Sequence, residues 1–465
     1  MLRSALTVRA LSVILLTAIA LLTGIAGYTG ETPDNATERL RQYLRVDSSQ
    51  DSGRERALVL LRDQLHAEGL ATQWIVSPNG VPSLVSRLEA PSGSDESVVL
   101  LHHADVVATG EGWLHPPYDA VVQDGVIHGR GALDAKSLGI AHMEAFLAAS
   151  RNRSSLVRDL IFLVVSDEEE GGAEGSKWLL EAHPEIFAGV IAVLGEGGIN
   201  RVYGDQLAWW GLEVAQKRPL WLRVEAKGRP GHGSTLNLHT APHRLIRALD
   251  RLLERPLEFR VTPEVRLYLE SIAPYENRGI KRIAERLDEI MALPHPESKM
   301  LPGIPNYFLD SIQINMLQAG EQPNSAPDSA SAWIDIRLLP DTDEQQFLRD
   351  VRDRLGDDVS VTILLDAPPV DPSPVKGAGF VCISEALSDE APVVPAFIPG
   401  ITDSRFFRQR GIPAYGFSPF KLGGASLKGI HGIDEQIPLA VFNAGISTMI
   451  EVVQSCTSDR EEWLP

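Results

Sequence analysis

Residues 98–105 carry the stretch Val98-Val99-Leu100-Leu101-His102-His103-Ala104-Asp105, an apolar run that ends in polar groups. A short apolar run rich in β-branched residues is typical of a strand buried on both faces of a sheet. Side chains two positions apart on a strand share a face, so His103 and Asp105 are expected on one side and His102 on the other. The stretch therefore predicts a buried strand that presents polar side chains at its carboxyl end.

Similar apolar runs occur at residues 160–165 and 190–194, and helical patterns at residues 137–149 and 175–182 lie between them. Buried strands that alternate with helices predict an α/β fold, with a mostly parallel central sheet flanked by helices. The open ends of such sheets are where ligand sites usually lie.

The pattern changes near Arg218. The alternating residues 220–226 begin an order of strand, helix, strands, helix and strand that ends at about residue 365, which is typical of a small α+β domain. The α/β pattern returns after the proline-rich residues 367–374. We therefore predict a larger α/β domain formed by residues 31–217 and 368–465, interrupted by a smaller domain at residues 218–367.

The first 30 residues are expected to lie outside both domains. Arg3 and Arg9 precede an uncharged apolar run at residues 10–27. This is the layout of a signal peptide, and the run is also just long enough to remain as a membrane anchor. Both alternatives predict an extracytoplasmic protein, either periplasmic or secreted.

Composition excludes some partners and metal sites. The formal net charge of -19 repels phosphate backbones, so nucleic acid is not an expected partner. The chain has two cysteines, Cys382 and Cys456, and no Cys-x-x-Cys motif. A thiolate zinc site is therefore not supported, and the sequence leaves open whether the two cysteines pair.

Polar groups that could bind metal recur where predicted strands end or a helix begins. Each has an ordinary explanation on its own, such as a helix-capping aspartate or a solvated acidic loop. Together they supply two histidines and three carboxylates, which suits two zinc ions that share a bridging carboxylate. The positions are His103, followed by Asp105; Asp134 in Gly129–Lys136; the acidic run Asp167–Glu170; Glu196; and His431.

In order and approximate spacing, these motifs resemble one family of metallopeptidases. The family includes carboxypeptidase G, carboxypeptidase S, aminoacylase and succinyl-diaminopimelate desuccinylase, and the resemblance covers nearly everything after residue 35. The segments 402–407, 415–417 and 113–118 look most like the branch of carboxypeptidase S and the secreted N-acyl amino acid hydrolases. The resemblance implies a catalytic α/β domain interrupted by a ferredoxin-like lid that also forms dimers.

The resemblance also implies a role for each matching residue. Asp134 would bridge two metal ions, with His103 and Glu196 completing one site and Glu169 and His431 the other. Glu168 would be the general base, and Asp105 would orient His103. In the lid, His232 would stabilise the oxyanion, often in a neighbouring subunit's site, while Asn324 and Arg337 would contact substrate; a surface ion pair is an alternative for Arg337.

The chain departs from the family pattern at Ala135, Ser137 and Gly195, none of which removes a ligand. The family often has a cis peptide after the bridging aspartate, and the sequence leaves open whether Asp134–Ala135 is one.

The function expected from the sequence is an exported hydrolase that cleaves an amide bond in small peptides or N-acyl amino acids. Its cofactors would be two zinc ions, although cobalt or manganese also suits the ligands. A dipeptidase or desuccinylase of the same family, a single-metal site, and a catalytically silent binding protein at the membrane are alternatives.

Overall fold

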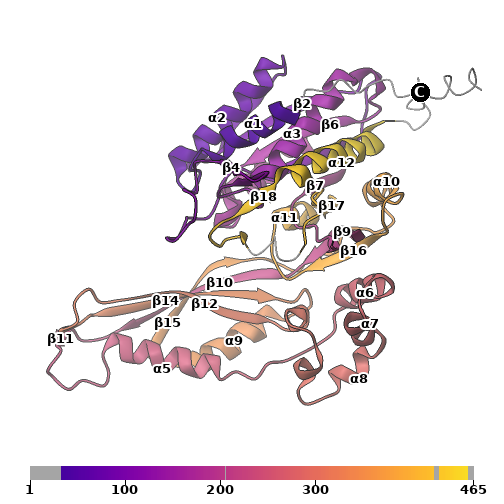
Figure 1. Cartoon of the computed structure of the whole chain (residues 1–465). Helices are drawn as coiled ribbons and strands as arrows, with labels where there is room; N and C mark the ends of the chain where they lie inside the picture. The colour runs from indigo at the N-terminus through magenta and orange to yellow at the C-terminus, as the bar shows by residue number, and fades with distance from the viewer. Residues whose placement is uncertain (1–32, 205, 424–428, 459–465) are drawn as a thin grey trace, which may run out of the picture.

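A computed structural model describes residues 33–204, 206–423 and 429–458 of the chain (Figure 1). The predicted signal peptide or anchor, residues 1–30, lies outside the described residues. Two sheets dominate the molecule, and each has its own hydrophobic core.

The larger sheet is parallel at its centre, with antiparallel pairs at the β1-β2-β6 edge and between β17 and β9, and this mostly parallel sheet confirms the expected α/β class. Parallel pairing joins β6 to β3, β3 to β7, β7 to β17, and β9 to β16. Across the sheet the strands are β1 (Gln73–Val76), β2 (Pro82–Leu88), β6 (Asp159–Val165), β3 (Ser97–His103), β7 (Val190–Gly195), β17 (Ala414–Gly416), β9 (Gln206–Gln216) and β16 (Val393–Ile398), and β8 (Arg201–Tyr203) pairs with β9.

Both faces of the larger sheet are covered, and strand β3 shows why. Val98 and Leu100 pack into one core, whereas Val99 and Leu101 pack into the other. The first face is covered by α1 (Pro33–Leu44), α2 (Asp51–Ala67), α3 (Lys136–Arg151), α10 (Ala378–Leu387) and α12 (Leu439–Thr457), and the second by α4 (Trp178–Ala182) and α11 (Ser404–Gln409).

Helix α12 is the one helix among the described residues that is long and apolar enough to cross a membrane. It packs instead into the core of the larger sheet, where Phe442, Met449 and Val452 are buried. A disulfide between Cys382 of α10 and Cys456 of α12, with Cα atoms 5.0 Å apart, settles the pairing that the sequence left open.

The smaller sheet has the order β12-β14-β10-β15, with every pair antiparallel. Its chain order, strand, helix, strand, strand, helix, strand, is ferredoxin-like. Helices α5 and α9 cover one face. The elements are β10 (Arg218–Lys227), α5 (Ala241–Leu253), β12 (Ser311–Ala319), β14 (Ser329–Leu338), α9 (Glu344–Leu355) and β15 (Val359–Asp366).

Three helices between α5 and β12 belong to the core of the larger sheet rather than to that of the smaller one. Tyr268 of the first helix packs edge to face on Trp209 of β9, and Tyr307, which follows the three helices in the chain, lies beside Phe397 of β16. The helices are α6 (Pro263–Ile272), α7 (Arg278–Glu285) and α8 (Leu287–Met291). They attach the interrupting segment to the larger sheet.

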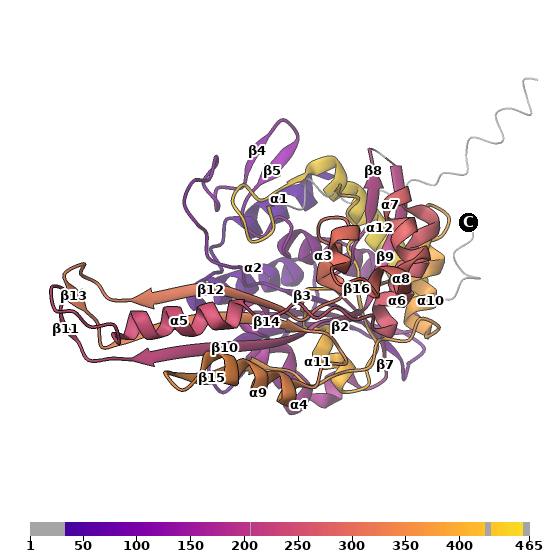
Figure 2. The ribbon, with the colours of Figure 1, turned by 90° about the horizontal axis from the view of Figure 1, so that it is seen from below.

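Within the described residues, two small sheets lie outside the main ones. Strands β4 (Val121–Gln123), β5 (Val126–His128) and β18 (Gln436–Pro438) form a three-stranded sheet that brings the C-terminal part of the chain beside residues 121–128. Strands β11 (Gly231–His232) and β13 (Ser325–Ala326) pair at the far end of the smaller sheet, away from the larger one (Figures 1 and 2).

Candidate metal centre

The candidate ligands meet where the central strands end. His103 is the last residue of β3, Glu196 follows the last residue of β7, and Glu169 lies in the turn after β6. Because β6, β3 and β7 are adjacent and parallel, their carboxyl ends reach the same edge of the sheet. Asp134 approaches this edge from the turn before α3, and His431 approaches it from the loop before β18.

Asp134 lies between the two histidines. Its Oδ1 atom is 3.1 Å from Nε2 of His103, and its Oδ2 atom is 3.2 Å from Nε2 of His431. One carboxylate thus presents a separate oxygen to each histidine, which is the arrangement that a bridging ligand requires. The Asp134–Ala135 peptide bond is cis, which answers the question that the sequence left open.

The other two predicted ligands divide between the histidines. Oε2 of Glu196 is 3.4 Å from Nε2 of His103, and Oε1 of Glu169 is 3.2 Å from Nε2 of His431. The donor atoms of His103, Glu168 and Glu196 lie within 4.8 Å of one another, as do those of Asp134, Glu169 and His431. The structure therefore brings together all five predicted ligands and Glu168.

Asp105 is fully buried and supports this cluster in two ways. Its backbone oxygen is 3.0 Å from Nδ1 of His103, while its carboxylate Oδ1 is 3.7 Å from the same nitrogen. The carboxylate accepts hydrogen bonds from the backbone N–H groups of Glu168 (3.3 Å) and Glu169 (2.9 Å). Asp105 therefore fixes the turn that carries the two glutamates as well as facing His103.

Buried negative charge is the main electrostatic feature of the cluster. Burial and the charge of Glu196 raise the pKa of Glu168 well above its ordinary value. Burial, with the charge of Asp134 contributing, raises the pKa of Glu196 to about 7. Such carboxylates are costly to ionise unless a cation lies beside them.

The same carboxylates favour the charged form of the two histidines. Burial opposes protonation of His103, but the charge of Glu196 and the hydrogen bonds that the imidazole donates to Asp134 and Glu196 raise its pKa well above its ordinary value. Hydrogen bonds to Asp134 and Glu169 raise the pKa of His431 to about 10. The field at both imidazoles therefore favours positive charge.

The donor set fits a pair of divalent cations. Imidazole nitrogens and carboxylate oxygens are ligands of zinc, and of cobalt and manganese as well. Each histidine shares its group with a separate glutamate, and Asp134 offers one oxygen to each group. The two groups have the composition of two metal sites that share a bridge.

His102, the neighbour of His103, points to the opposite face of the sheet, as the strand alternation predicted. It is buried beside the rings of Tyr43, His142 and Phe162. Burial lowers its pKa well below the ordinary value, so the imidazole is neutral. His102 is therefore a core residue.

Two residues predicted from the lid lie apart from the cluster within one chain. His232 is exposed on β11, where it pairs with Ser325 of β13, and Asn324 accepts a 2.7 Å hydrogen bond from the backbone of Gly233. Both residues are at the far end of the smaller sheet, away from the larger sheet (Figure 2). Within one chain, therefore, these two residues do not lie beside the candidate ligands.

Arg337 is on β14 and forms a two-pronged ion pair with Asp335, with N–O distances of 2.7 and 2.8 Å. The indole N–H of Trp221 also donates to Asp335, at 3.0 Å. The guanidinium is therefore engaged within the smaller sheet, although its side chain retains 25% exposure.

Sequence reasoning assigned no role to two buried residues near the acidic turn, Asp167–Gly172. Arg405 donates to the backbone oxygens of Gly171 (2.7 Å) and Thr402 (2.8 Å). Asp403 accepts a 2.6 Å hydrogen bond from Ser176. Both belong to the segment 402–407 that carries the family resemblance, and that resemblance was the available signal.

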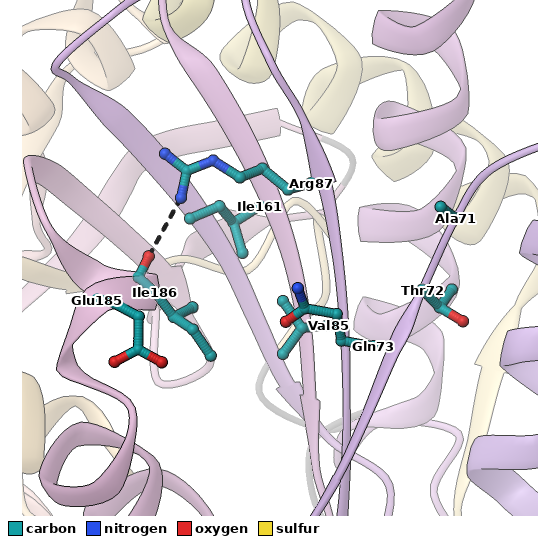
Figure 3. A pocket seen from close by; sticks show the side chains of 8 residues that line it. All are labelled: Ala71, Thr72, Gln73, Val85, Arg87, Ile161, Glu185 and Ile186. Carbon is teal, nitrogen blue, oxygen red and sulfur yellow. Dashed lines mark hydrogen bonds between the residues drawn. The ribbon is translucent and has the colours of Figure 1, made fainter.

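A separate cavity of about 360 Å³ lies over β2 and β6, at the end of the sheet that is remote from the cluster (Figure 3). Arg87 borders it, pairs with Asp159 at 2.7 Å, and donates a 3.4 Å hydrogen bond to the backbone oxygen of Ile186. None of the predicted site residues lines this cavity.

Comparison with known proteins identifies the class. Residues 99–455 match the model of peptidase family M20/M25/M40. The match covers more than half of the chain, and the chain belongs to this family. Its members are hydrolases, which confirms the class of enzyme predicted from the motifs.

Individual relatives span nearly the whole chain. The chain is 27% identical to aminoacylase-1 of Sus scrofa, over 93% of this chain and 97% of that protein. It is 27% identical to the N-fatty-acyl-amino acid synthase/hydrolase PM20D1 of Bos taurus, over 81% and 78%. Human carnosine dipeptidase 1 has a similar fold, with 18% identity, coverage of 91% and 97%, and a TM-score of 0.71.

Proposed function

We propose that this amide hydrolase cleaves N-acyl amino acids or small peptides, with two zinc ions as its cofactors. The observation that carries the proposal is Asp134 placed between His103 and His431, each with its own glutamate. Relatives named as an aminoacylase and as an N-fatty-acyl-amino acid synthase/hydrolase support N-acyl amino acids as the first substrates to test.

The ligand residues would hold the ions at fixed positions. His103 and Glu196 would hold one ion, Glu169 and His431 the other, and Asp134 would bridge them. Divalent ions at such positions supply Lewis acidity that polarises a carbonyl and makes water more acidic.

Glu168 is the proposed general base. It lies in the group with His103 and Glu196, and Asp105 holds its backbone. Its carboxylate would accept a proton from the attacking water and donate it to the nitrogen of the leaving amine. This transfer requires Glu168 to be ionised, and two divalent cations beside it would offset the burial that raises its pKa.

We also propose a homodimer in which the tip of the smaller sheet reaches the partner's metal centre. His232 is exposed at this tip and is remote from the metal cluster of its own chain. Among the described residues β12 pairs only with β14, and Met316 and Leu317 on this edge strand are exposed. An apolar, unpaired edge is suited to strand pairing with a second copy.

Export is proposed on two grounds. Residues 1–30 have the layout of a signal peptide or anchor. The disulfide between Cys382 and Cys456 is the kind of bond that persists in oxidising compartments. Cell fractionation followed by N-terminal sequencing of the exported chain would separate cleavage from retention, and recovery of the chain in the cytoplasm would contradict export.

The function is tested by measuring metal content and hydrolysis on the same preparation. The purified chain is assayed against a panel of N-acyl amino acids and dipeptides, before and after removal of metal with a chelator. We expect about two zinc ions per chain and cleavage that is lost with the metal and restored by zinc. Two bound metals without cleavage of any panel member would support the silent binding protein instead.

A further inference from the structure

Glu435 lies four positions after His431 and is fully buried. Its carboxylate accepts hydrogen bonds from three backbone N–H groups of the turn that leads to Asp134: Gly131 at 2.9 Å, Leu133 at 2.7 Å and Asp134 at 3.1 Å. Three converging amides form a site for an anion, which Glu435 fills. The backbone of Asp134 is thereby fixed from the C-terminal part of the chain.

Arg130 links the same two segments in the opposite direction, from the turn before Asp134 to the loop of His431. One guanidinium nitrogen donates to Oε2 of Glu435 at 2.8 Å, and the other donates to the backbone oxygen of Gly432 at 2.8 Å. The guanidinium lies over the ring of Trp113, 5.1 Å from its centre. Arg130 thus fixes the residue next to His431, just as Glu435 fixes Asp134.

The backbone around His431 requires such support. His431 and Asp434 both have positive φ angles, 57° and 58°, which are uncommon for residues other than glycine. Such conformations persist only where the surroundings hold them. Arg130 holds Gly432, the backbone N–H of Gly129 donates to the oxygen of Glu435 at 2.9 Å, and β18 pairs with β5 immediately beyond.

We propose that Glu435 is a positioning residue for the metal centre, setting metal affinity by locking the turn of Asp134 to the loop of His431. The two segments are about 300 residues apart in the chain and carry the bridging ligand and one terminal ligand. The proposal rests on the proposed two-metal function. Groups that support ligands in this way typically change metal affinity by about 10–100-fold when they are removed.

The test compares two carboxylate-to-amide variants of the full chain. Glu435→Gln alters the positioning residue. Asp159→Asn is a matched control, because Asp159 is also buried, pairs with an arginine (Arg87) and accepts a backbone N–H, from Ala90, at the opposite end of the sheet. Zinc dissociation constants are measured by competition with a chromophoric chelator, and thermal unfolding is followed on the same samples.

Both variants are expected to unfold at a lower temperature, because each loses the charge of a buried carboxylate that pairs with an arginine and accepts backbone hydrogen bonds. Only Glu435→Gln is expected to bind zinc about 10–100-fold more weakly, with both ions still bound at saturating zinc. An unchanged zinc affinity in Glu435→Gln, or an equal loss in Asp159→Asn, would overturn the proposal. A wild-type chain that binds no zinc would instead refute the two-metal function itself.

Arg130→Lys keeps the test decisive if Glu435→Gln does not fold. Lysine retains the positive charge but cannot donate to Glu435 and Gly432 with the fixed fork of a guanidinium. We expect weaker zinc binding in this variant, and wild-type affinity would overturn the proposal.

Discussion

Glu168 and Glu169 are adjacent in the chain, yet their carboxylates face different partners. Glu168 lies with His103 and Glu196, whereas Glu169 lies with Asp134 and His431. The backbone N–H groups of both residues are held by Asp105, so the turn presents one side chain to each half of the cluster. A single turn thus supplies a proposed ligand and the proposed base.

The assignment of Glu168 predicts a separation of metal binding from activity. Glu168→Gln is expected to retain about two zinc ions and to lose hydrolysis by about 10²–10⁴-fold, because the amide cannot accept the proton. Glu169→Gln is the comparison, since it alters a proposed ligand and should also lower the zinc content. Measurements of kcat and bound zinc on both variants check this; wild-type kcat in Glu168→Gln would exclude it as the base.

His142 predicts a loss of stability in acid. It is fully buried on α3, burial lowers its pKa to about 3, and its ring nitrogens have no hydrogen-bond partner among the described residues. In the unfolded chain its pKa returns to about 6.5, so the unfolded state binds more protons as the pH falls below 6.5. The stabilisation is complete above pH 6.5 and declines towards pH 3.

Between pH 7 and pH 5 this effect should lower the free energy of unfolding by about 2 kcal/mol. His142→Leu removes the titrating group, so its loss over the same interval should be smaller by that amount. Denaturant unfolding of both proteins at the two pH values provides the comparison, and equal losses would show that His142 does not titrate as described.

At the scale of elements, the strands and helices with a clear period were predictable. The buried apolar runs correspond to β3, β6 and β7, and the expected helix at 137–149 corresponds to α3. These elements were predictable because burial on one face or both sets the spacing of apolar residues along the chain. The expected helix at 175–182 instead begins with a π-helical turn, Ala173–Lys177, before α4. Strand β9 was not predicted, since Gly211, Glu213 and Gln216 interrupt the apolar residues of 209–216, although all eight positions are buried.

The disulfide joins two elements, α10 and α12, across a sequence separation of 74 residues. Replacing both cysteines by serine should lower the free energy of unfolding by about 2–4 kcal/mol, because the unfolded chain regains the freedom of a long loop. Denaturant unfolding of the double variant and of the wild type, each with and without a reducing agent, tests this. The reductant should destabilise only the wild type; equal sensitivity of both proteins would contradict the pairing.

At the scale of the whole molecule, the smaller sheet carries β11, the strand that holds His232, to its far end, away from the larger sheet that bears the candidate ligands (Figure 2). If a partner's cluster receives His232, neither Glu168→Gln nor His232→Ala forms an active homodimer. A mixed dimer, however, contains one site with both wild-type residues. Equal mixing and re-association should therefore restore about a quarter of wild-type activity, the share expected for random pairing in a two-fold dimer.

Activity of the mixture is measured beside each variant alone at the same total concentration. The control is a mixture of Glu168→Gln with Glu169→Gln. Both substitutions alter the candidate metal centre of their own chain, so a mixed dimer contains no site in which every residue is wild type. The dimer proposal fails if the first mixture is no more active than its components.

The sequence by itself determined the α/β class, the candidate ligands and the family, because burial and metal binding favour particular residue types in short local patterns. The tertiary structure decided what depends on contacts between distant segments. It placed Asp134 between two histidines that are more than 300 residues apart in the chain, paired Cys382 with Cys456, and joined Arg130 to Glu435. Such contacts leave no repeating pattern of residues in the sequence. Hydrogen bonds and ion pairs between distant segments form only once the folded sheet has brought those segments together.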